Sequence, residues 1–269
     1  MKGIINIGNS CYMNSALQLL FNSNDLCRII LTANNNDMIL LSNNIKDYHN
    51  NNSNSFNPTL IKQYIDKITK QFRGSTQQDS SEFIIYFLDI IDKYSHSSLY
   101  NFFGIETTIN IKCKKLECLT ESIHIENDLF LHLDISPNLD DSYRQYKSVV
   151  ELVDNNSYKC EKCNKYTIGR KKIQITKWPS NLIIVLKRFN NMMRKDNTLI
   201  KVPLEWRHEY KLMGGIIHMG DTLGGHYISY GKKNNNWFIA NDNKISLIDS
   251  IETFMERSGS QSYILHYMK

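Results

Sequence analysis

The amino-acid sequence predicts an α+β fold, in which helices come first and a mostly antiparallel β half follows. Two segments, 11–21 and 78–94, carry apolar residues at helical spacing. Beyond residue 105 the pattern changes, because apolar and polar residues alternate as they do in half-buried strands. At 269 residues the chain is long for one core but does not require two, so we expect a single lobed domain.

The predicted elements follow in order along the chain. A helix begins at or beside Cys11, directly after the turn-forming Gly8-Asn9-Ser10. Residues 34–57 are rich in Asn and Ser, so we expect long loops around short helices there. A second strong helix spans 78–94. Strands are expected at 107–112, 123–125, 129–133, 181–189, 216–218, 226–230, 237–240 and 263–267.

Composition and charge exclude several classes of protein. The net charge of +5 is small for this length and its basic residues are scattered, which argues against a nucleic-acid partner. No apolar run approaches the roughly 20 residues that span a bilayer, and the N-terminus lacks a cleavable hydrophobic segment. We therefore expect an intracellular monomer, cytoplasmic or nuclear, that binds neither nucleic acid nor membrane.

Cys11 is the candidate nucleophile. Cysteine attacks as its thiolate, and a position at a helix N-terminus lowers the thiol pKa because unpaired backbone amides favour the anion. His226 is the candidate general base, since two glycines precede it and the alternation after it sets it at the edge of a strand. Asn241 and Asp242 follow about one hairpin later, and either side chain could accept the ring N–H.

Five segments carry long or specific patterns. They are 3–18 around Cys11, Gln77-Gln78-Asp79 at a helix start, Leu186-Lys187-Arg188-Phe189, 225–246 around His226, and the closing Tyr263-Ile264-Leu265-His266-Tyr267. In this order they resemble the motifs of the ubiquitin-specific proteases, which are ubiquitin carboxyl-terminal hydrolases of the papain-like superfamily. The match covers nearly the whole chain.

The resemblance implies a fold and an activity. The fold is a papain-like cysteine protease with a helical thumb, an antiparallel β palm and zinc-bearing fingers. One catalytic domain, 1–269, is expected, with 1–100 as the thumb, 101–175 mainly the fingers and 176–269 mainly the palm. The activity is that of a deubiquitinating thiol hydrolase, which cleaves the isopeptide or peptide bond after the C-terminal glycine of ubiquitin through an acyl-enzyme on Cys11. Its partners are then ubiquitin and ubiquitinated proteins.

The resemblance also implies roles for the catalytic residues. His226 is the general base and then the acid, and Asn241 orients it, with Asp242 kept as a supporting group that could itself be catalytic. Asn6 matches the family's oxyanion asparagine, and one such donor is commonly worth ~2.7–4 kcal/mol. Its alternative is a turn-former in a Gly- and Asn-rich loop.

Residues that match substrate-binding positions are Asp79, Glu82, Gln18 and Gly225. Acidic residues would complement the basic tail of ubiquitin. Asp79 and Glu82 also have capping-box spacing, which would stabilise a helix start instead. Gln18 could equally lie on the polar face of its helix. Gly225 closes the turn 220–225, expected to form a mobile loop over the tail.

Four further cysteines form two close pairs, Cys113 with Cys118 and Cys160 with Cys163. Zinc favours four thiolates in a tetrahedron, so we expect one structural zinc ion and no catalytic cofactor. The first pair leaves four residues between its thiols where the family usually has two. The alternative is free cysteines. Cys27 has no partner in the pattern and is expected to be a small buried residue.

Three other functions remain open. The same chemistry could act on another ubiquitin-like modifier, or the chain could be a non-catalytic ubiquitin-binding scaffold. The two Cys pairs and nearby basic residues also allow a zinc-ribbon nucleic-acid binder.

Overall fold

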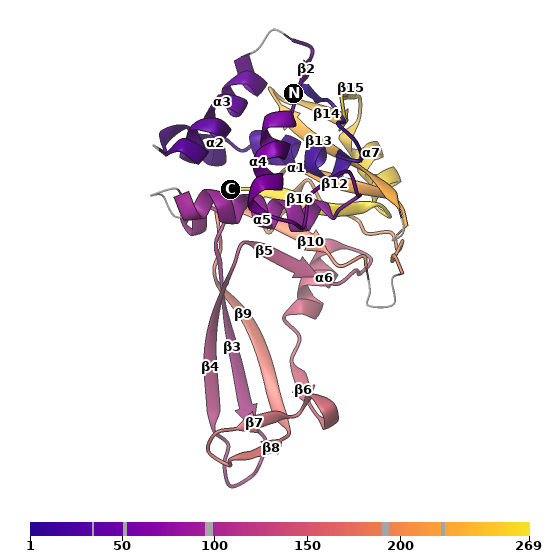
Figure 1. Ribbon diagram of the computed structural model, residues 1–269. Helices are drawn as coiled ribbons and strands as arrows, with labels where there is room; N and C mark the ends of the chain where they lie inside the picture. Colours follow the sequence, from indigo (N-terminus) through magenta and orange to yellow (C-terminus); the bar gives the residue numbers. More distant parts are fainter. Residues whose placement is uncertain (34, 51–52, 95–98, 190–193, 222–223) are drawn as a thin grey trace.

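The computed structural model describes residues 1–33, 35–50, 53–94, 99–189, 194–221 and 224–269. Helices α1 to α5 gather against one side of an eight-stranded sheet, and a four-stranded sheet projects away from this body (Figure 1). The predicted α+β class is confirmed. Residues 222 and 223 of the expected mobile loop lie outside the described residues. In the described ranges, no helix has both the length and the apolar character needed to cross a membrane.

The helical part begins with a short parallel pair, β1 (Gly3–Ile4) with β2 (Ser55–Phe56). Its helices are α1 (Cys11–Phe21), α2 (Asn24–Thr32), α3 (Asn36–Asn50), α4 (Thr59–Ile68) and α5 (Ser80–Tyr94). Every residue of α1 is buried, because this helix lies between the other helices and the sheet. The helix predicted to start at or beside Cys11 starts at that residue.

The prediction of long loops in 34–57 is wrong for most of that segment. α3 covers 36–50, and its buried residues recur at helical spacing: Met38, Leu41, Ile45 and Tyr48. This apolar stripe packs against α2 and α4, and its burial outweighs the preference of Asn for turns. Asn34, Asn51 and Asn52 lie outside the described residues.

The larger sheet has the strand order β15-β14-β13-β12-β16-β10-β5, and β11 pairs with β12. Its members are β5 (Phe130–Leu133), β10 (Asn181–Leu186), β11 (Glu205–Trp206), β12 (Tyr210–Gly220), β13 (Gly225–Lys233), β14 (Asn236–Asn241), β15 (Lys244–Ile248) and β16 (Ser262–Met268). All pairs are antiparallel except β5 with β10, which is parallel.

The sheet is covered on both faces. In β10, Ile183 and Val185 pack with the α1–α5 helices, whereas Leu182, Ile184 and Leu186 pack with the second core. That second core also contains residues of α6 (Leu139–Tyr146) and α7 (Ile251–Ser258). Burial of both faces explains why this strand is an unbroken apolar run.

The smaller sheet has the order β4-β3-β9-β6. It consists of β3 (Ile105–Cys113), β4 (Glu121–Asp128), β6 (Val150–Leu152) and β9 (Gly169–Lys177), and the hairpin of β7 (Tyr158–Cys160) and β8 (Lys165–Thr167) lies at its far end (Figure 1). β4 is exposed along most of its length. The division into thumb, fingers and palm stays a prediction.

Arg188, in the Leu186-Lys187-Arg188-Phe189 motif, is 1% exposed. Its guanidinium donates to the backbone carbonyls of Asp196 (2.7 Å), Thr198 (3.1 Å) and Gly259 (2.6 Å), and also to that of Ser262. Burial lowers its pKa to about 10, which still leaves it charged at neutral pH. The side chain therefore ties the segment after β10 to the start of β16.

Replacing Arg188 by Met should lower the free energy of unfolding by roughly 3–5 kcal/mol, because buried carbonyls lose their donors. Urea unfolding followed by tryptophan fluorescence measures this. Lys187→Met is the control, since Lys187 pairs with Asp134 at 3.3 Å across an exposed surface and should cost about 0.5 kcal/mol or less. Equal unfolding midpoints for the two variants would contradict a structural role for Arg188.

Candidate active site

Cys11 is 3% exposed at the first position of α1, where that helix packs against β13. Burial raises the pKa of its thiol, and Asp242 raises it further. Hydrogen bonds from backbone groups of Tyr227, Tyr12 and Cys11 itself lower the pKa but do not outweigh burial. The predicted net lowering of the thiol pKa by the helix start is therefore wrong.

His226 and Asn241 form a hydrogen bond of 2.7 Å between the ring Nε2 and the amide Oδ1. Both stand at strand ends, His226 near the start of β13 and Asn241 at the end of β14, and these two strands are neighbours in the sheet. An amide oxygen only accepts, so Nε2 carries the proton and Nδ1 keeps its lone pair. Tyr227, the next residue after the histidine, contributes a backbone hydrogen bond to Cys11, so the strand segment that carries the imidazole lies against the start of α1.

Asp242 holds two asparagines from the start of the chain. Its Oδ2 accepts from Asn6 Nδ2 at 2.9 Å, and its Oδ1 accepts from Asn14 Nδ2 at 2.7 Å. Asn6 Oδ1 in turn accepts from the backbone N–H groups of Gly8 (3.1 Å) and Ser10 (3.3 Å). The structure thus separates the two adjacent residues: Asn241 bonds the histidine, and Asp242 orients Asn6.

Asp79 caps α5, as the alternative interpretation of its position predicts. Its Oδ1 accepts from the backbone N–H groups of Ser81 at 2.7 Å and Glu82 at 3.2 Å. Its Oδ2 accepts from the hydroxyls of Tyr227 (3.1 Å) and Tyr263 (2.8 Å). The carboxylate is therefore engaged on both oxygens within the fold.

Glu82 is exposed, and its Oε2 accepts from Gln71 Nε2 at 2.8 Å. Gln18 is 2% exposed; its amide donates to the Lys2 carbonyl and accepts from the Tyr48 hydroxyl at 2.6 Å. These hydrogen bonds satisfy both polar atoms of the Gln18 amide within the fold. Its contact with substrate stays a prediction, as does that of Glu82.

Gly225 lies where no side chain fits. A Cβ there would stand 2.2 Å from His218 Nε2 and 2.5 Å from the Met219 carbonyl oxygen. Its backbone N–H donates to Gln77 Oε1 at 3.0 Å, and its carbonyl accepts from Gln77 Nε2 at 2.9 Å. Gln77 belongs to the Gln77-Gln78-Asp79 motif of the sequence, but the motif does not reveal that its side chain bonds to Gly225.

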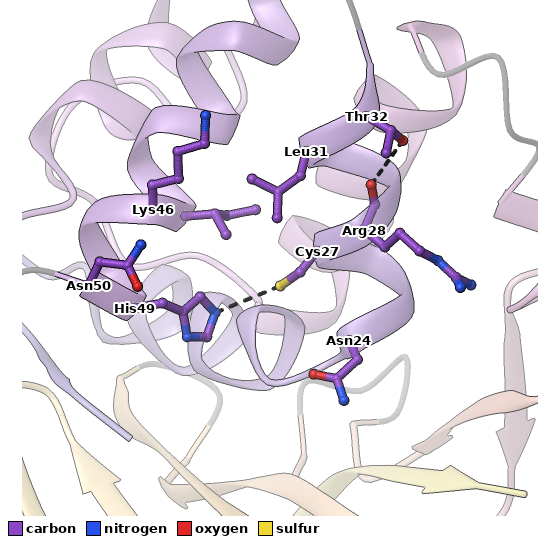
Figure 2. Close-up of a pocket in the computed structure, with 9 residues that line it drawn as sticks. Asn24, Cys27, Arg28, Leu31, Thr32, Lys46, His49 and Asn50 are labelled. Atoms are coloured by element: carbon purple, nitrogen blue, oxygen red, sulfur yellow. Dashed lines mark hydrogen bonds between the residues drawn. The ribbon is translucent and has the colours of Figure 1, made fainter.

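A second cysteine–histidine pair lies in a pocket of about 470 Å³ between α2 and α3, in which Cys27 and His49 point toward one another (Figure 2). Sγ and Nε2 are 3.8 Å apart, and both contact the carbonyl oxygen of Phe21, at 3.3 Å and 3.1 Å. Because Nε2 donates to that carbonyl, it is no base for the thiol. Cys27 is buried, as predicted, and His49 is a partner that the sequence pattern did not reveal. Burial raises the pKa of Cys27 to about 11.

Cys27 should react with iodoacetamide at pH 7 a few hundredfold more slowly than free cysteine, because a thiol of raised pKa holds little thiolate there. Since thiolate forms as pH rises, the rate should increase about tenfold per pH unit up to the raised pKa. Peptide mapping by mass spectrometry follows Cys27 separately from the other thiols. Modification at pH 7 as fast as that of free cysteine would mean that His49 activates it.

The four remaining cysteines meet at the far end of the smaller sheet, in the turns and strand ends of β3, β4, β7 and β8. Their sulfur atoms all lie within 4.8 Å of one another. Cys113 and Cys163 are 4.0 Å apart, and Cys118 and Cys160 are 3.7 Å apart. A tetrahedral zinc with Zn–S bonds of about 2.3 Å has S···S edges of about 3.8 Å, so the four thiols fit such an ion despite the wider first pair.

A buried cysteine that starts a helix, packed against a sheet bearing a histidine–asparagine pair, defines the papain-like class of α+β cysteine hydrolases. The family model described as ubiquitin carboxyl-terminal hydrolase matches residues 2–267. The chain therefore belongs to the ubiquitin carboxyl-terminal hydrolase family, and the resemblance read from the sequence is confirmed.

Relatives support the same family. The chain is 26% identical to ubiquitin carboxyl-terminal hydrolase 25 of Arabidopsis thaliana, over 99% of this chain and 47% of that protein. It is also 26% identical to human ubiquitin carboxyl-terminal hydrolase 3, over 99% of this chain and 68% of that protein. It thus spans less than half the length of the Arabidopsis relative.

A solved structure supports the fold. It is the structure of the SAGA Ubp8/Sgf11/Sus1/Sgf73 DUB module bound to ubiquitin aldehyde. One chain of that structure superposes on this protein with a TM-score of 0.86 and 23% sequence identity. The match covers 100% of this chain and 69% of the other chain. The predicted papain-like fold class is thereby confirmed.

Proposed function

We propose that this chain is a deubiquitinating thiol hydrolase, which cleaves the isopeptide or peptide bond after the C-terminal glycine of ubiquitin. The observation that carries the proposal is the hydrogen-bonded His226–Asn241 pair, whose histidine lies on the strand that packs against the helix starting at the buried thiol of Cys11. Family membership supports ubiquitin as the substrate class, and ubiquitin and ubiquitinated proteins are the proposed partners.

His226 takes the proton of Cys11 in the first step. The bond from Nε2 to Asn241 keeps the lone pair on Nδ1, the nitrogen that can act as base. Burial raises the pKa of Cys11 and so disfavours the thiolate. The positive charge of the imidazolium that forms in this step stabilises the thiolate and offsets that effect. The sulfur then attacks the carbonyl carbon of the last glycine of the substrate tail.

Asn6 stabilises the oxyanion that this attack creates. One N–H of its amide goes to Asp242, and the amide oxygen is held by backbone N–H groups of Gly8 and Ser10. The second N–H has no recorded partner among the described residues and serves as donor, together with the backbone N–H of Cys11. Such a donor is worth ~2.7–4 kcal/mol in the transition state, provided that it is held in place beforehand.

His226 then gives its proton to the leaving amine, and the tail of ubiquitin stays as a thioester on Cys11. A water molecule next loses a proton to His226 and attacks the thioester carbonyl. The thiolate leaves and takes up the proton again, which releases ubiquitin with a free carboxylate. Glu82, whose carboxylate is exposed, is the better candidate for contact with basic residues of the tail, because Asp79 is engaged by the helix cap and two tyrosines.

Cys11→Ser should abolish release of a fluorescent amine from the C-terminus of ubiquitin, because a serine hydroxyl is a much weaker nucleophile beside an imidazole. His226→Ala should reduce the rate by at least about a thousandfold. Cys27→Ser is the matched control and should keep wild-type turnover. Full activity of Cys11→Ser would end the proposal.

Two other functions are tested in the same way. A panel of ubiquitin-like modifiers with the same leaving group separates modifier classes, and turnover of another modifier alone would favour that substrate. Binding of ubiquitin by wild type without turnover would favour a scaffold. The expectations of a monomer, of an intracellular location, and of no nucleic-acid or membrane partner stay predictions.

Asn241→Ala and Asp242→Asn should lower activity by different routes. Asn241→Ala removes the acceptor of Nε2–H, so the imidazole loses its orientation and kcat should fall by about tenfold or more. Asp242→Asn keeps the shape but weakens the hold on Asn6, so kcat should fall. Because it also removes a charge that raises the pKa of Cys11, the alkylation profile of Cys11 should move to lower pH, whereas Asn241→Ala should move it to higher pH. Indistinguishable alkylation profiles for the two variants would contradict the separate roles.

Cys113, Cys118, Cys160 and Cys163 are proposed to bind one structural zinc ion. When bound, the ion would hold together the turns at the far end of the smaller sheet and take no part in the reaction. Cys160→Ser should release the metal and lower the unfolding temperature, as measured by elemental analysis and thermal melts, whereas Cys27→Ser should change neither. Unchanged metal content and melting in Cys160→Ser would contradict the zinc site.

A further inference from the structure

At its start, β13 is paired with a neighbouring strand along only one of its two edges. β12 pairs with it from Gly225 onward, but pairing with β14 begins at Ser229. His226 therefore lies in a segment whose second edge is paired with no strand among the residues that the structure describes. Backbone groups on such an edge need other partners to keep their position.

Gln77 supplies those partners for Gly225. The side-chain amide accepts from the Gly225 N–H at 3.0 Å and donates to the Gly225 carbonyl at 2.9 Å, so one amide makes the two bonds that a neighbouring strand would make. Two residues further along β13, the Tyr227 backbone hydrogen-bonds to Cys11 at the start of α1. The open edge of β13 is thus completed by residues that precede or begin helices α5 and α1.

The residue after the histidine is held by the same segment. The Tyr227 hydroxyl donates to Asp79 Oδ2 at 3.1 Å, while Asp79 Oδ1 caps α5. Gln77 and Asp79 therefore hold Gly225 and Tyr227, the two residues that flank His226. Ser75, at the beginning of this segment, accepts from Asn9 Nδ2 at 2.7 Å, which ties it to the loop before Cys11.

We infer that Gln77 is a positioning residue for His226, acting through the backbone of Gly225. The inference rests on the proposed function. No Cβ fits at position 225, so this residue is a glycine and has no side chain that could fix its position. Its two backbone hydrogen bonds to Gln77 therefore set the backbone direction at His226, the next residue. Gln77 thereby keeps the imidazole aimed at Cys11 before any substrate arrives.

Alkylation of Cys11 by iodoacetamide, measured from pH 5 to 10 without ubiquitin, tests this role. Gln77→Ala should react about tenfold more slowly at pH 7, with the rise in rate moved to higher pH, because two hydrogen bonds that orient the base are lost. Gln77→Met, of nearly the same length, should behave alike and excludes a packing effect. Gln78→Ala is the matched control, since Gln78 donates locally to Thr76 Oγ1 at 3.0 Å, and should stay within twofold of wild type.

With the fluorescent ubiquitin substrate, kcat of the Gln77 variants should fall by a similar factor while KM changes little. Wild-type alkylation profiles in both Gln77 variants, combined with a raised KM, would overturn the inference and make Gln77 a substrate contact. Without the imidazole, the rate of Cys11 alkylation in His226→Ala should rise only at alkaline pH. If the wild-type protein showed that same profile, the proposed function would fail, and this inference with it.

Discussion

The packing of α1 against β13 brings Cys11, near the beginning of the chain, against the strand that carries His226, near its end. This contact depends on a helix that is buried along its whole length, with side chains such as Leu17, Leu20 and Phe21 each contributing about 1.5–3 kcal/mol of burial. A helix buried on all sides cannot shift without opening the core. The position of the nucleophile is therefore set by the same apolar contacts that stabilise the fold.

Burial of Cys11 also has an electrostatic consequence. The environment that holds the thiol raises its pKa, although the backbone amides around it favour the thiolate. The site consequently depends on a well-placed imidazole more than on the helix start. The 2.7 Å bond to Asn241 and the two bonds between Gln77 and Gly225 are the contacts that give the imidazole its direction.

Polar side chains near the active site join the helical part to the sheet in two places. Asp242 reaches from the end of the β14 strand to Asn6 and Asn14, and Asp79 reaches from α5 to Tyr227 and Tyr263. Asp242 uses both oxygens for its two bonds, whereas Asp79 binds both tyrosines through Oδ2 and caps α5 through Oδ1. These hydrogen bonds offset the cost of partial burial. The proposed catalytic groups come from both parts, so these bonds hold the parts that carry Cys11, His226 and Asn6 in one arrangement.

Much of the fold followed from local sequence patterns. The helix at Cys11, most strands of the larger sheet and the two Cys pairs are each encoded by residues close together in the chain, so periodicity and spacing were sufficient to predict them. The strands β9 and β15 were not predicted. The loop prediction for 34–57 failed because Asn has a strong local preference for turns, which the burial of Met38, Leu41 and Ile45 overrides only in the packed structure.

The choice between Asn241 and Asp242, the direction of the Cys11 pKa shift and the partner of Gln77 depended on tertiary structure alone. Each arises from atoms that are distant in sequence, as in the Asn6–Asp242 bond between residues 236 positions apart. The sequence by itself determined which residues are proposed for the chemistry, because nucleophile, base and thiol ligands were inferred from residue type and motif. Only packing decided which of them bond to one another, because hydrogen bonds and burial are defined by distances in the folded chain.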